Sequence, residues 1–193
     1  MKKNILILAL VLFVSTAFSQ NKSIELNAGK QFSPFRAYRN HTGYEHISLG
    51  MSKDFTPKFG VLFSQSYARM YSKNTNNRTI ATTTTISHYH TFFAANKINL
   101  RLSLGTGLLY LNTKCLYNDY PVKDNIYGIP VKANLAVFYK LSDKLAINLN
   151  LDTHYGFLFY GDYTLLIDDP YYYKTFFYSA NVGLRYTFGN KTE

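Results

Sequence analysis

The stretch that decides the fold is Asn181-Val182-Gly183-Leu184-Arg185-Tyr186-Thr187-Phe188, in which polar and apolar side chains alternate up to a final aromatic residue. Successive side chains of a β-strand point to opposite faces. A strand between lipid and a polar interior therefore needs an apolar residue at every second position. The same alternation recurs through most of the chain. It predicts an all-β fold, an eight-stranded antiparallel up-and-down transmembrane β-barrel.

The predicted strands and turns have an ordered spacing. The alternating segments cover about residues 23–31, 44–54, 59–72, 79–93, 98–110, 129–140, 145–157 and 176–188. Short turns near 55–58, 94–97 and 142–144 alternate with long connections near 32–43, 73–78, 113–126 and 161–172. Outer-membrane barrels have tight periplasmic turns and longer external loops. An even strand number then leaves both termini in the periplasm.

One predicted strand, residues 79–93, has no clear apolar face. Its even-numbered positions include Ile80, Ile86 and Phe92, but also His88 and His90. A histidine that faces hydrocarbon is costly. We therefore expect the odd-numbered face to point outward, namely Ala81, Thr83, Thr85, Tyr89 and Phe93. A β-bulge that switches faces within the strand is the alternative.

The N-terminus has the pattern of a secretory signal peptide. Lys2 and Lys3 precede an apolar run from Ile5 to Val14, and small residues follow at Ala17 and Ser19. The run is too short for a transmembrane helix, which needs about 20 residues. We predict a cleaved signal peptide at 1–19 and a single barrel domain at 20–193. No cysteine directly follows the apolar run, so a lipid anchor is not expected.

Composition limits the classes of partner. The formal net charge is +10, of which Lys2 and Lys3 supply two, which leaves +8 for residues 20–193. An exported protein rarely meets nucleic acid, so no nucleic-acid partner is expected. Outer-membrane lipid, and anionic lipopolysaccharide in particular, is the expected counter-charge, although solvated lysines would also account for the excess. With 18 Tyr, 15 Phe and no Trp, interfacial aromatic belts must consist of Tyr and Phe. Cys115, the single cysteine, cannot form an internal disulfide and is expected in a loop.

The C-terminal stretch resembles the insertion signal of bacterial outer-membrane barrels. Asn181, Gly183, Tyr186 and Phe188 match that signal residue by residue. The whole chain after the signal peptide is similar to small outer-membrane proteins of the broad OmpA-barrel, OmpX and OmpW type. It is closest in style to the β-barrel-domain proteins common in Bacteroidetes, whose signal peptides often end in a small residue followed by Gln, as in Ser19-Gln20. The resemblance implies insertion by the outer-membrane assembly machinery and residence in the outer membrane. It implies no single biochemical task.

The main structural alternative is a soluble eight-stranded barrel of the lipocalin type, which keeps its apolar face inside. Alternation alone does not tell which face is outside. The terminal aromatic signal, the charges on the polar face and the alternation of short and long turns all favour the membrane barrel.

The predicted lumen collects charged side chains. Glu25, Arg101, Lys132, Asp152 and Arg185 fall on the polar face of their strands, together with Asn27, Asn148 and Asn150. The interior of an eight-stranded barrel is just wide enough for side chains to fill it. Unpaired charges there are expensive, so opposite charges should pair and plug the lumen. A narrow, gated ion path is the alternative.

Histidines suggest two further kinds of site. His46 and Ser48 share a face, and they resemble the His-x-Ser arrangement of outer-membrane lipid A deacylases. Here the pair falls on the predicted lumen face in an early strand, and no carboxylate that would orient the histidine is identifiable. His88, His90 and His154 are a weak candidate for a metal site. We expect no metal, no cofactor and no enzymatic activity.

The last long connection contains Tyr171, Tyr172 and Tyr173. Clustered tyrosines suit contact with a protein or glycan, because each offers a rigid ring and a hydroxyl group. An upper aromatic belt at the lipid headgroups is an equal alternative. The sequence thus favours a non-enzymatic structural or interaction role, with surface loops or an envelope protein partner. A narrow OmpW-like channel for small or apolar molecules is the second hypothesis, and a lipid A-modifying enzyme is the third.

Overall fold

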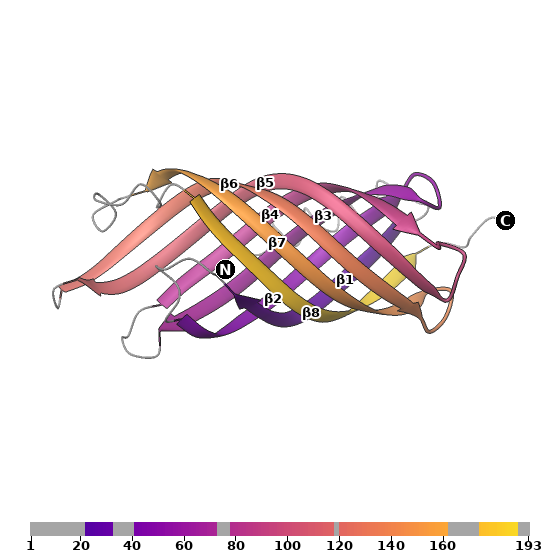
Figure 1. The fold of residues 1–193 in the computed structure, drawn as a ribbon, viewed down its shortest axis with the longest axis horizontal. Helices are drawn as coiled ribbons and strands as arrows, with labels where there is room; N and C mark the ends of the chain where they lie inside the picture. Colours follow the sequence, from indigo (N-terminus) through magenta and orange to yellow (C-terminus); the bar gives the residue numbers. More distant parts are fainter. Residues whose placement is uncertain (1–21, 33–40, 73–77, 118–119, 162–173, 189–193) are drawn as a thin grey trace.

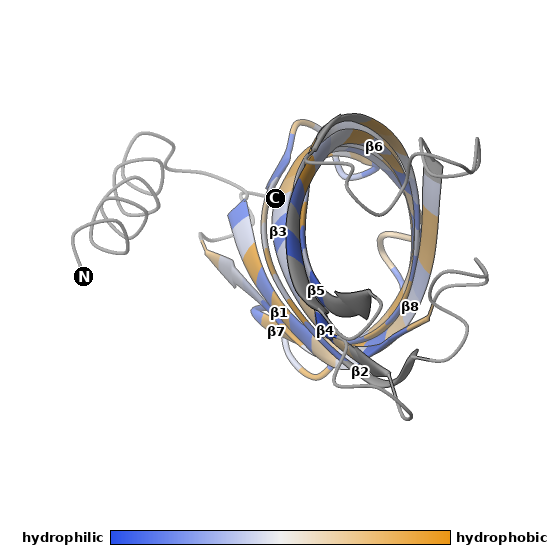
Figure 2. Cartoon of the chain, turned by 90° about the vertical axis from the view of Figure 1, so that its left-hand side faces the viewer, coloured by the Kyte–Doolittle hydropathy of each residue, from blue (hydrophilic) through white to orange (hydrophobic). Residues whose placement is uncertain are grey.

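The chain forms a closed barrel of eight antiparallel strands. The computed structural model describes residues 22–32, 41–72, 78–117, 120–161 and 174–188. The strands are β1 (Lys22–Phe32), β2 (His41–Asp54), β3 (Phe59–Ser72), β4 (Arg78–Phe92), β5 (Ile98–Tyr117), β6 (Tyr120–Lys140), β7 (Leu145–Gly161) and β8 (Lys174–Phe188). Each strand pairs with its neighbours along the chain, and β1 pairs with β8, so the sheet has no free edge (Figures 1 and 2). The predicted fold class is confirmed.

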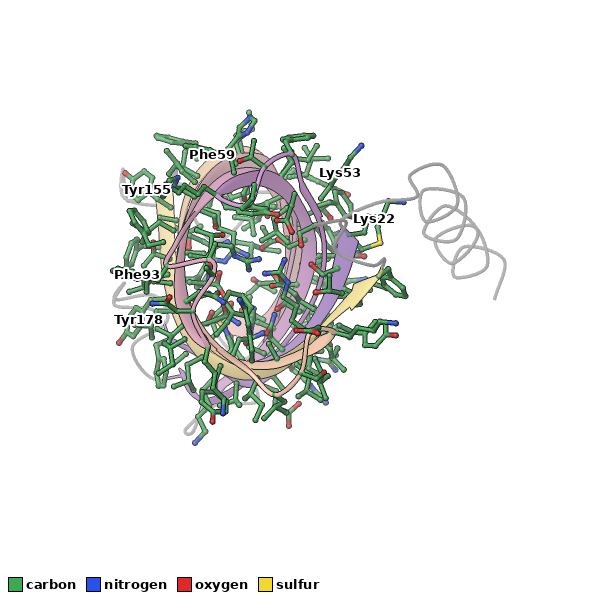
Figure 3. The ribbon with its side chains drawn as sticks, turned by 90° about the vertical axis from the view of Figure 1, so that its right-hand side faces the viewer. Lys22, Lys53, Phe59, Phe93, Tyr155 and Tyr178 are labelled. Atoms are coloured by element: carbon green, nitrogen blue, oxygen red, sulfur yellow. The ribbon has the colours of Figure 1, made fainter. Side chains whose placement is uncertain are left out.

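The apolar face of the sheet is outside. Along β5, Leu104 is 63% exposed, whereas Arg101 is 1% exposed. Nitrogen and oxygen atoms converge inside the ring, while Phe59, Tyr155 and Tyr178 point away from it (Figure 3). A lipocalin-type barrel would show the reverse arrangement. The barrel therefore has a lipid-compatible exterior, as the membrane interpretation requires.

Three short turns gather at one end of the barrel (Figure 1). Thr56 Oγ1 accepts hydrogen bonds from the backbone N–H groups of Lys58 and Phe59, at 3.3 and 3.1 Å. Ser142 Oγ makes the equivalent bonds to Lys144 and Leu145, at 3.3 and 3.1 Å. Hydroxyl side chains thus satisfy the backbone donors that these tight connections would otherwise leave exposed. By the rule for outer-membrane barrels, this end is periplasmic, and we call it the inner end.

The opposite, outer end carries a hairpin that the sequence did not predict. Residues 113–126 were expected to form a long loop, but β5 and β6 continue as paired strands from Thr113↔Asp124 to Tyr117↔Tyr120. Cys115 therefore lies in β5, paired with Val122, and not in a loop. The two strands have 20 and 21 residues, about twice what a membrane crossing needs. Their hairpin extends farther than any other described part of this end (Figure 1).

The predicted facing of the fourth strand is wrong. In β4 the odd-numbered side chains face the lumen, and Tyr89 is 3% exposed. His88 and His90 point outward. The ring centroid of His90 lies 4.5 Å from that of Phe59 and 4.3 Å from that of Phe92. Both histidines lie near the inner end of β4, where polar side chains cost much less than at the bilayer midplane.

Two predictions concern residues that lie outside the described part of the chain, namely the signal peptide at 1–19 and the tyrosines Tyr171, Tyr172 and Tyr173. The described residues contain no helix that is long and apolar enough to cross a membrane.

Candidate functional site

The lumen holds a bidentate ion pair between β1 and β5. Arg101 Nη1 and Nη2 donate to Glu25 Oε1 and Oε2 at 2.5 and 2.6 Å. The residues are 76 positions apart in sequence and both are fully buried. Two parallel charge-assisted bonds fix both side chains in one geometry. The pair therefore ties opposite parts of the barrel wall together across the lumen.

Toward the inner end, this pair continues into a ring of charges and aromatic side chains. Arg185 lies 3.8 Å from Glu25 and 3.5 Å from Asp54, and its Nε donates to Ser23 Oγ at 2.8 Å. The Tyr89 hydroxyl donates a hydrogen bond to Asp54. The Phe138 ring lies between the two guanidinium groups, with its centroid 4.7 Å from Arg101 Cζ and 5.2 Å from Arg185 Cζ. Cation–π contacts of this kind stabilise the arginines where water is excluded.

A second ion pair lies farther from the inner end. Lys132 Nζ is 3.1 Å from Asp152 Oδ1 and also donates to Ser64 Oγ at 3.2 Å. The Asp152 carboxylate accepts further bonds from Asn134 Nδ2 and Asn181 Nδ2, both at 3.0 Å. This buried carboxylate of β7 therefore has partners from both neighbouring strands, β6 and β8. Such full satisfaction is what makes a buried charge tolerable.

The lumen near the outer end is apolar, which the sequence analysis did not predict. A cluster of buried side chains from β3 to β8 fills it: Ala68, Met70, Ala81, Leu109, Leu111, Ile126, Leu158 and Phe177. The expectation that hydrophilic residues fill the whole interior is therefore wrong for this part. Apolar side chains close the lumen here more completely than polar ones would, because they offer no hydrogen-bond partners to water.

Between the two ion pairs the lumen is almost full. The cavity there has a volume of about 10 Å³ and is lined by residues that include Glu25, Ser64, Arg101, Lys132 and Asp152. This is close to the smallest volume that holds one water molecule. The structure thus brings the five predicted network residues into two linked clusters, Glu25–Arg101–Arg185 and Lys132–Asp152. Both clusters lie in the lumen.

His46 and Ser48 both face this packed interior. His46 Nδ1 lies 2.7 Å from Asn181 Oδ1, and Asn27 Nδ2 donates to Ser48 Oγ at 3.2 Å. Both residues are buried. A deacylase arrangement would require both side chains to face lipid, and here neither does. The two residues belong to the hydrogen-bonded network of the lumen.

The three histidines considered as metal ligands are not together. His154 is buried in the lumen, whereas His88 and His90 lie on the outer face. Among the described residues, no group of three or more His, Cys, Asp or Glu side chains is arranged to hold a metal ion. The proposed ligand set is therefore wrong.

The four residues that match the assembly signal lie on both faces of β8. Asn181 and Gly183 face the lumen, and Tyr186 and Phe188 form an edge-to-face pair on the outside, with centroids 5.0 Å apart. A Cβ at Gly183 would come within 2.4 Å of the Leu26 backbone oxygen. Glycine at this position therefore allows β1 and β8 to close the barrel.

Several lumen residues were missed by the sequence analysis, namely Asp54, Tyr89, Phe138 and the members of the outer apolar cluster. Tyr89 was assigned to the wrong face with the rest of its strand. A signal was present in the sequence: Thr83, Thr85, Ser87 and Thr91 share its face and are polar. For Leu109 and Leu111 no such signal exists, because both faces of β5 are apolar at this height.

Comparisons with known proteins agree with the fold. No protein-family model matches the sequence, and no curated protein is significantly similar to it. Ail, the attachment invasion locus protein of Yersinia pestis, has a similar structure, with a TM-score of 0.60 and 13% identity over 88% of this chain and 100% of that chain. Neisserial surface protein A gives a TM-score of 0.53 and 11% identity over 86% of this chain and 96% of that chain. The outer membrane protein OprG from Pseudomonas aeruginosa gives a TM-score of 0.50 and 10% identity over 89% of this chain and 98% of that chain.

At these identities the likeness shows the fold and no biochemical activity. The apolar exterior, the polar network inside and the inner-end turns agree with it. The chain is thus a small eight-stranded β-barrel of the outer-membrane type.

Proposed function

We propose that this protein is a sealed outer-membrane barrel with a structural or interaction role at the cell surface and no enzymatic activity. The observation that carries the proposal is the filled lumen. Two buried ion pairs and an apolar cluster occupy it, and the cavity between the pairs is about 10 Å³. An interior of this kind stabilises the barrel, and the outer surface then remains as the place where a partner would bind.

An ion that crossed the lumen would have to pass both the Glu25–Arg101 ion pair and the apolar cluster near the outer end. An ion would need to displace the bidentate bonds between Glu25 and Arg101, and the freed charges would remain in a dry interior. Separating the partners of one buried pair costs about 3–5 kcal/mol. The ion would then meet the apolar cluster, which offers it no polar partner. This argues against the narrow channel that the sequence left as an alternative.

The interaction role is supported at the outer end. The β5–β6 hairpin projects there with backbone pairs as far as Tyr117↔Tyr120. A paired hairpin presents its side chains with less loss of conformational entropy on binding than a loop does. Two of the similar structures carry names that refer to the cell surface or to attachment. These names apply to those proteins, and they make surface contact a reasonable role to test here.

Planar-bilayer recording tests the sealed lumen. The purified, folded protein should give no stable single-channel steps, and a large porin in the same preparation should give them. Arg101→Ala, which opens the interior near Glu25, serves as a sensitised variant. Stable steps from the unmodified protein would overturn the sealed-lumen proposal.

Affinity purification from the native envelope tests the interaction role. In the matched variant, a two-residue Asn-Gly turn replaces residues 114–123 and joins Thr113 to Asp124, which are already paired. A partner of the hairpin should be captured by the unmodified protein and lost with the variant. Equal capture by both proteins would contradict a role for the hairpin. Mass spectrometry of lipid A with and without expression tests the enzyme alternative, and we expect an unchanged acylation pattern.

A further inference from the structure

The outer face of β4, β5 and β6 departs from the regular barrel wall near the outer end. A groove of about 290 Å³ lies there, lined by Thr82, Thr84, Leu108, Leu109, Tyr110, Tyr127 and Gly128. The rings of Tyr110 and Tyr127 form part of this lining and contact each other, with centroids 5.1 Å apart. Its walls are aromatic and aliphatic groups and threonine side chains. In a bilayer, such a groove faces acyl chains.

The groove has a cause in the sequence. Between Thr106↔Val131 and Leu109↔Gly128 the ladder of β5 and β6 has no paired residues, and Pro130 lies in this gap. Proline has no N–H group to donate to a ladder. The pairing of β6 with β7 also shifts between Tyr127 and Gly128. The wall is therefore locally irregular at the groove.

A polar tier lies next to the groove on its outer side. The Tyr110 hydroxyl and Asn112 Nδ2 both donate to Asn125 Oδ1 at 2.7 Å. These groups face outward and are half-buried. They offer amide and hydroxyl groups directly beyond an apolar groove. Such groups suit the amide, ester or sugar linkages of a lipid.

A cationic tier follows, two residues farther along each strand. Arg78 of β4 is the Cα partner of Lys114 of β5, and Lys114 is the partner of Lys123 of β6. All three side chains belong to the outward-facing positions. The outward-facing residues described for β4, β5 and β6 include no Asp or Glu. By contrast, Glu45 lies between Lys30 and Arg69 in the corresponding row of β1, β2 and β3.

This arrangement has an energetic consequence. Directly opposite residues of antiparallel strands have Cα atoms about 4.5–5.5 Å apart, and like charges in such positions destabilise a sheet. Three neighbouring cations with no carboxylate among the described outward-facing residues of these strands are therefore expected to repel one another in the free protein. An anion with several negative charges would remove this repulsion. Phosphate groups are the anions available at the surface of a membrane.

The order of the tiers matches that of the parts of a membrane lipid. From Tyr110 to Lys114 the strand advances about 13 Å, at about 3.3 Å per residue. Toward the outer end, the groove would contact an acyl chain, the polar tier would contact the linkage to that chain, and the cationic tier would contact a phosphate. We propose that this face is a binding site for lipopolysaccharide, with lipid A phosphates on Arg78, Lys114 and Lys123 and one acyl chain in the groove.

The proposal rests on the barrel lying in the outer membrane with this end outward. It does not depend on the lumen being sealed, so a conducting lumen would overturn the proposed function and leave the lipid site intact. A soluble polyanion would contact the cationic tier alone and would leave the groove without a role. The groove is therefore the feature that distinguishes a lipid from a free phosphate.

Native mass spectrometry in neutral detergent micelles tests the site, with diphosphorylated lipid A as the probe. The test variant is R78Q/K114Q/K123Q. The control variant K58Q/K97Q/K144Q removes three charges at the inner end. Each Lys or Arg at an anionic headgroup strengthens binding about fivefold. We therefore expect the test variant to bind on the order of 10- to 100-fold more weakly and the control less than about twofold.

The groove has its own variant, Thr84→Phe, which fills it from β4. We expect it to weaken binding of lipid A without changing the heat-dependent gel shift of the folded barrel. Dephosphorylated lipid A should bind more weakly than the diphosphorylated form to the unmodified protein. Equal losses in the two triple variants, or equal binding of the two lipids, would overturn the site. If inorganic pyrophosphate displaced lipid A and Thr84→Phe bound normally, the acyl part of the proposal would be wrong.

A second readout does not need lipid. Since the three cations repel one another, R78Q/K114Q/K123Q should unfold at the same or a higher temperature than the unmodified protein in lipid-free neutral detergent. Diphosphorylated lipid A should raise the unfolding temperature of the unmodified protein only. A test variant that is less stable without lipid would contradict the inference that these three charges repel one another in the free protein.

Discussion

The replacement Glu25→Gln tests the ion pair that holds the lumen together. Glu25 accepts two bonds from Arg101 and lies 3.8 Å from Arg185, so its loss leaves the buried guanidinium group of Arg101 and the partly buried one of Arg185 without this carboxylate. Removing one partner of a buried pair costs about 3–5 kcal/mol. Arg101→Met should cost less, about 2–3 kcal/mol, because Glu25 keeps Arg185 as a partner. The double variant should recover much of the loss, since a well-packed neutral pair avoids the desolvation of two charges.

The assay is urea unfolding in detergent micelles, followed by the different gel mobility of the folded and unfolded barrels. Asp143→Asn, an exposed site in the turn between β6 and β7, is the control, and it should change the free energy of unfolding by less than about 0.5 kcal/mol. The structure makes a specific prediction about order: Glu25→Gln costs most, then Arg101→Met, then the control. If Glu25→Gln cost no more than Asp143→Asn, the reasoning about the lumen would be refuted.

Three further predictions use neighbouring residues as controls in the same unfolding assay. Gly183→Ala places a methyl group 2.4 Å from a backbone oxygen of β1 and should cost about 1–3 kcal/mol, whereas Gly50→Ala meets its nearest atom at 3.1 Å and should cost less. Leu109→Ala leaves a cavity in the apolar cluster and should cost about 2–4 kcal/mol; Leu108→Ala, 66% exposed on the lipid face, should cost under half of that because detergent or lipid fills the space. Tyr89→Phe removes a bond to a carboxylate and should cost about 1.5–3 kcal/mol, while His88→Leu should be neutral or stabilising; a reversed order would restore the opposite facing of β4.

Alternation predicted the barrel because the constraint behind it is strict. Each strand that crosses the membrane must present apolar side chains to lipid on one side. The sequence alone therefore predicts which side of β1, β5, β7 and β8 faces lipid. The polar lumen residues Glu25, Arg101 and Asp152 followed from the same rule. Their pairing did not. Glu25 and Arg101 are 76 residues apart, and only the register of the intervening strands brings them to the same height.

The errors occurred where this constraint is weak. Residues 113–126 mix polar and apolar side chains without a regular alternation, so they were predicted to form a loop. Strands that extend beyond the bilayer have no hydrocarbon to impose alternation. In β4 the constraint acts, but His88 and His90 lie near the membrane boundary, where it is relaxed. The apolar outer lumen was missed for a different reason. Leu108, Leu109 and Leu111 interrupt the alternation, and nothing local tells which of them faces inward.

Several irregular features of this barrel lie in one sector. Most of the wall has continuous ladders and turns with satisfied backbone groups, as stability alone would favour. The β4–β6 sector instead contains a gap in the ladder at Pro130, three neighbouring cations and a hairpin about twice the length that a membrane needs. Each of these features lowers stability or adds nothing to it. Departures from local rules without a structural gain are expected where a protein acts. Because charged pairs and apolar side chains pack in the lumen, we propose that this protein acts through the outside of that sector.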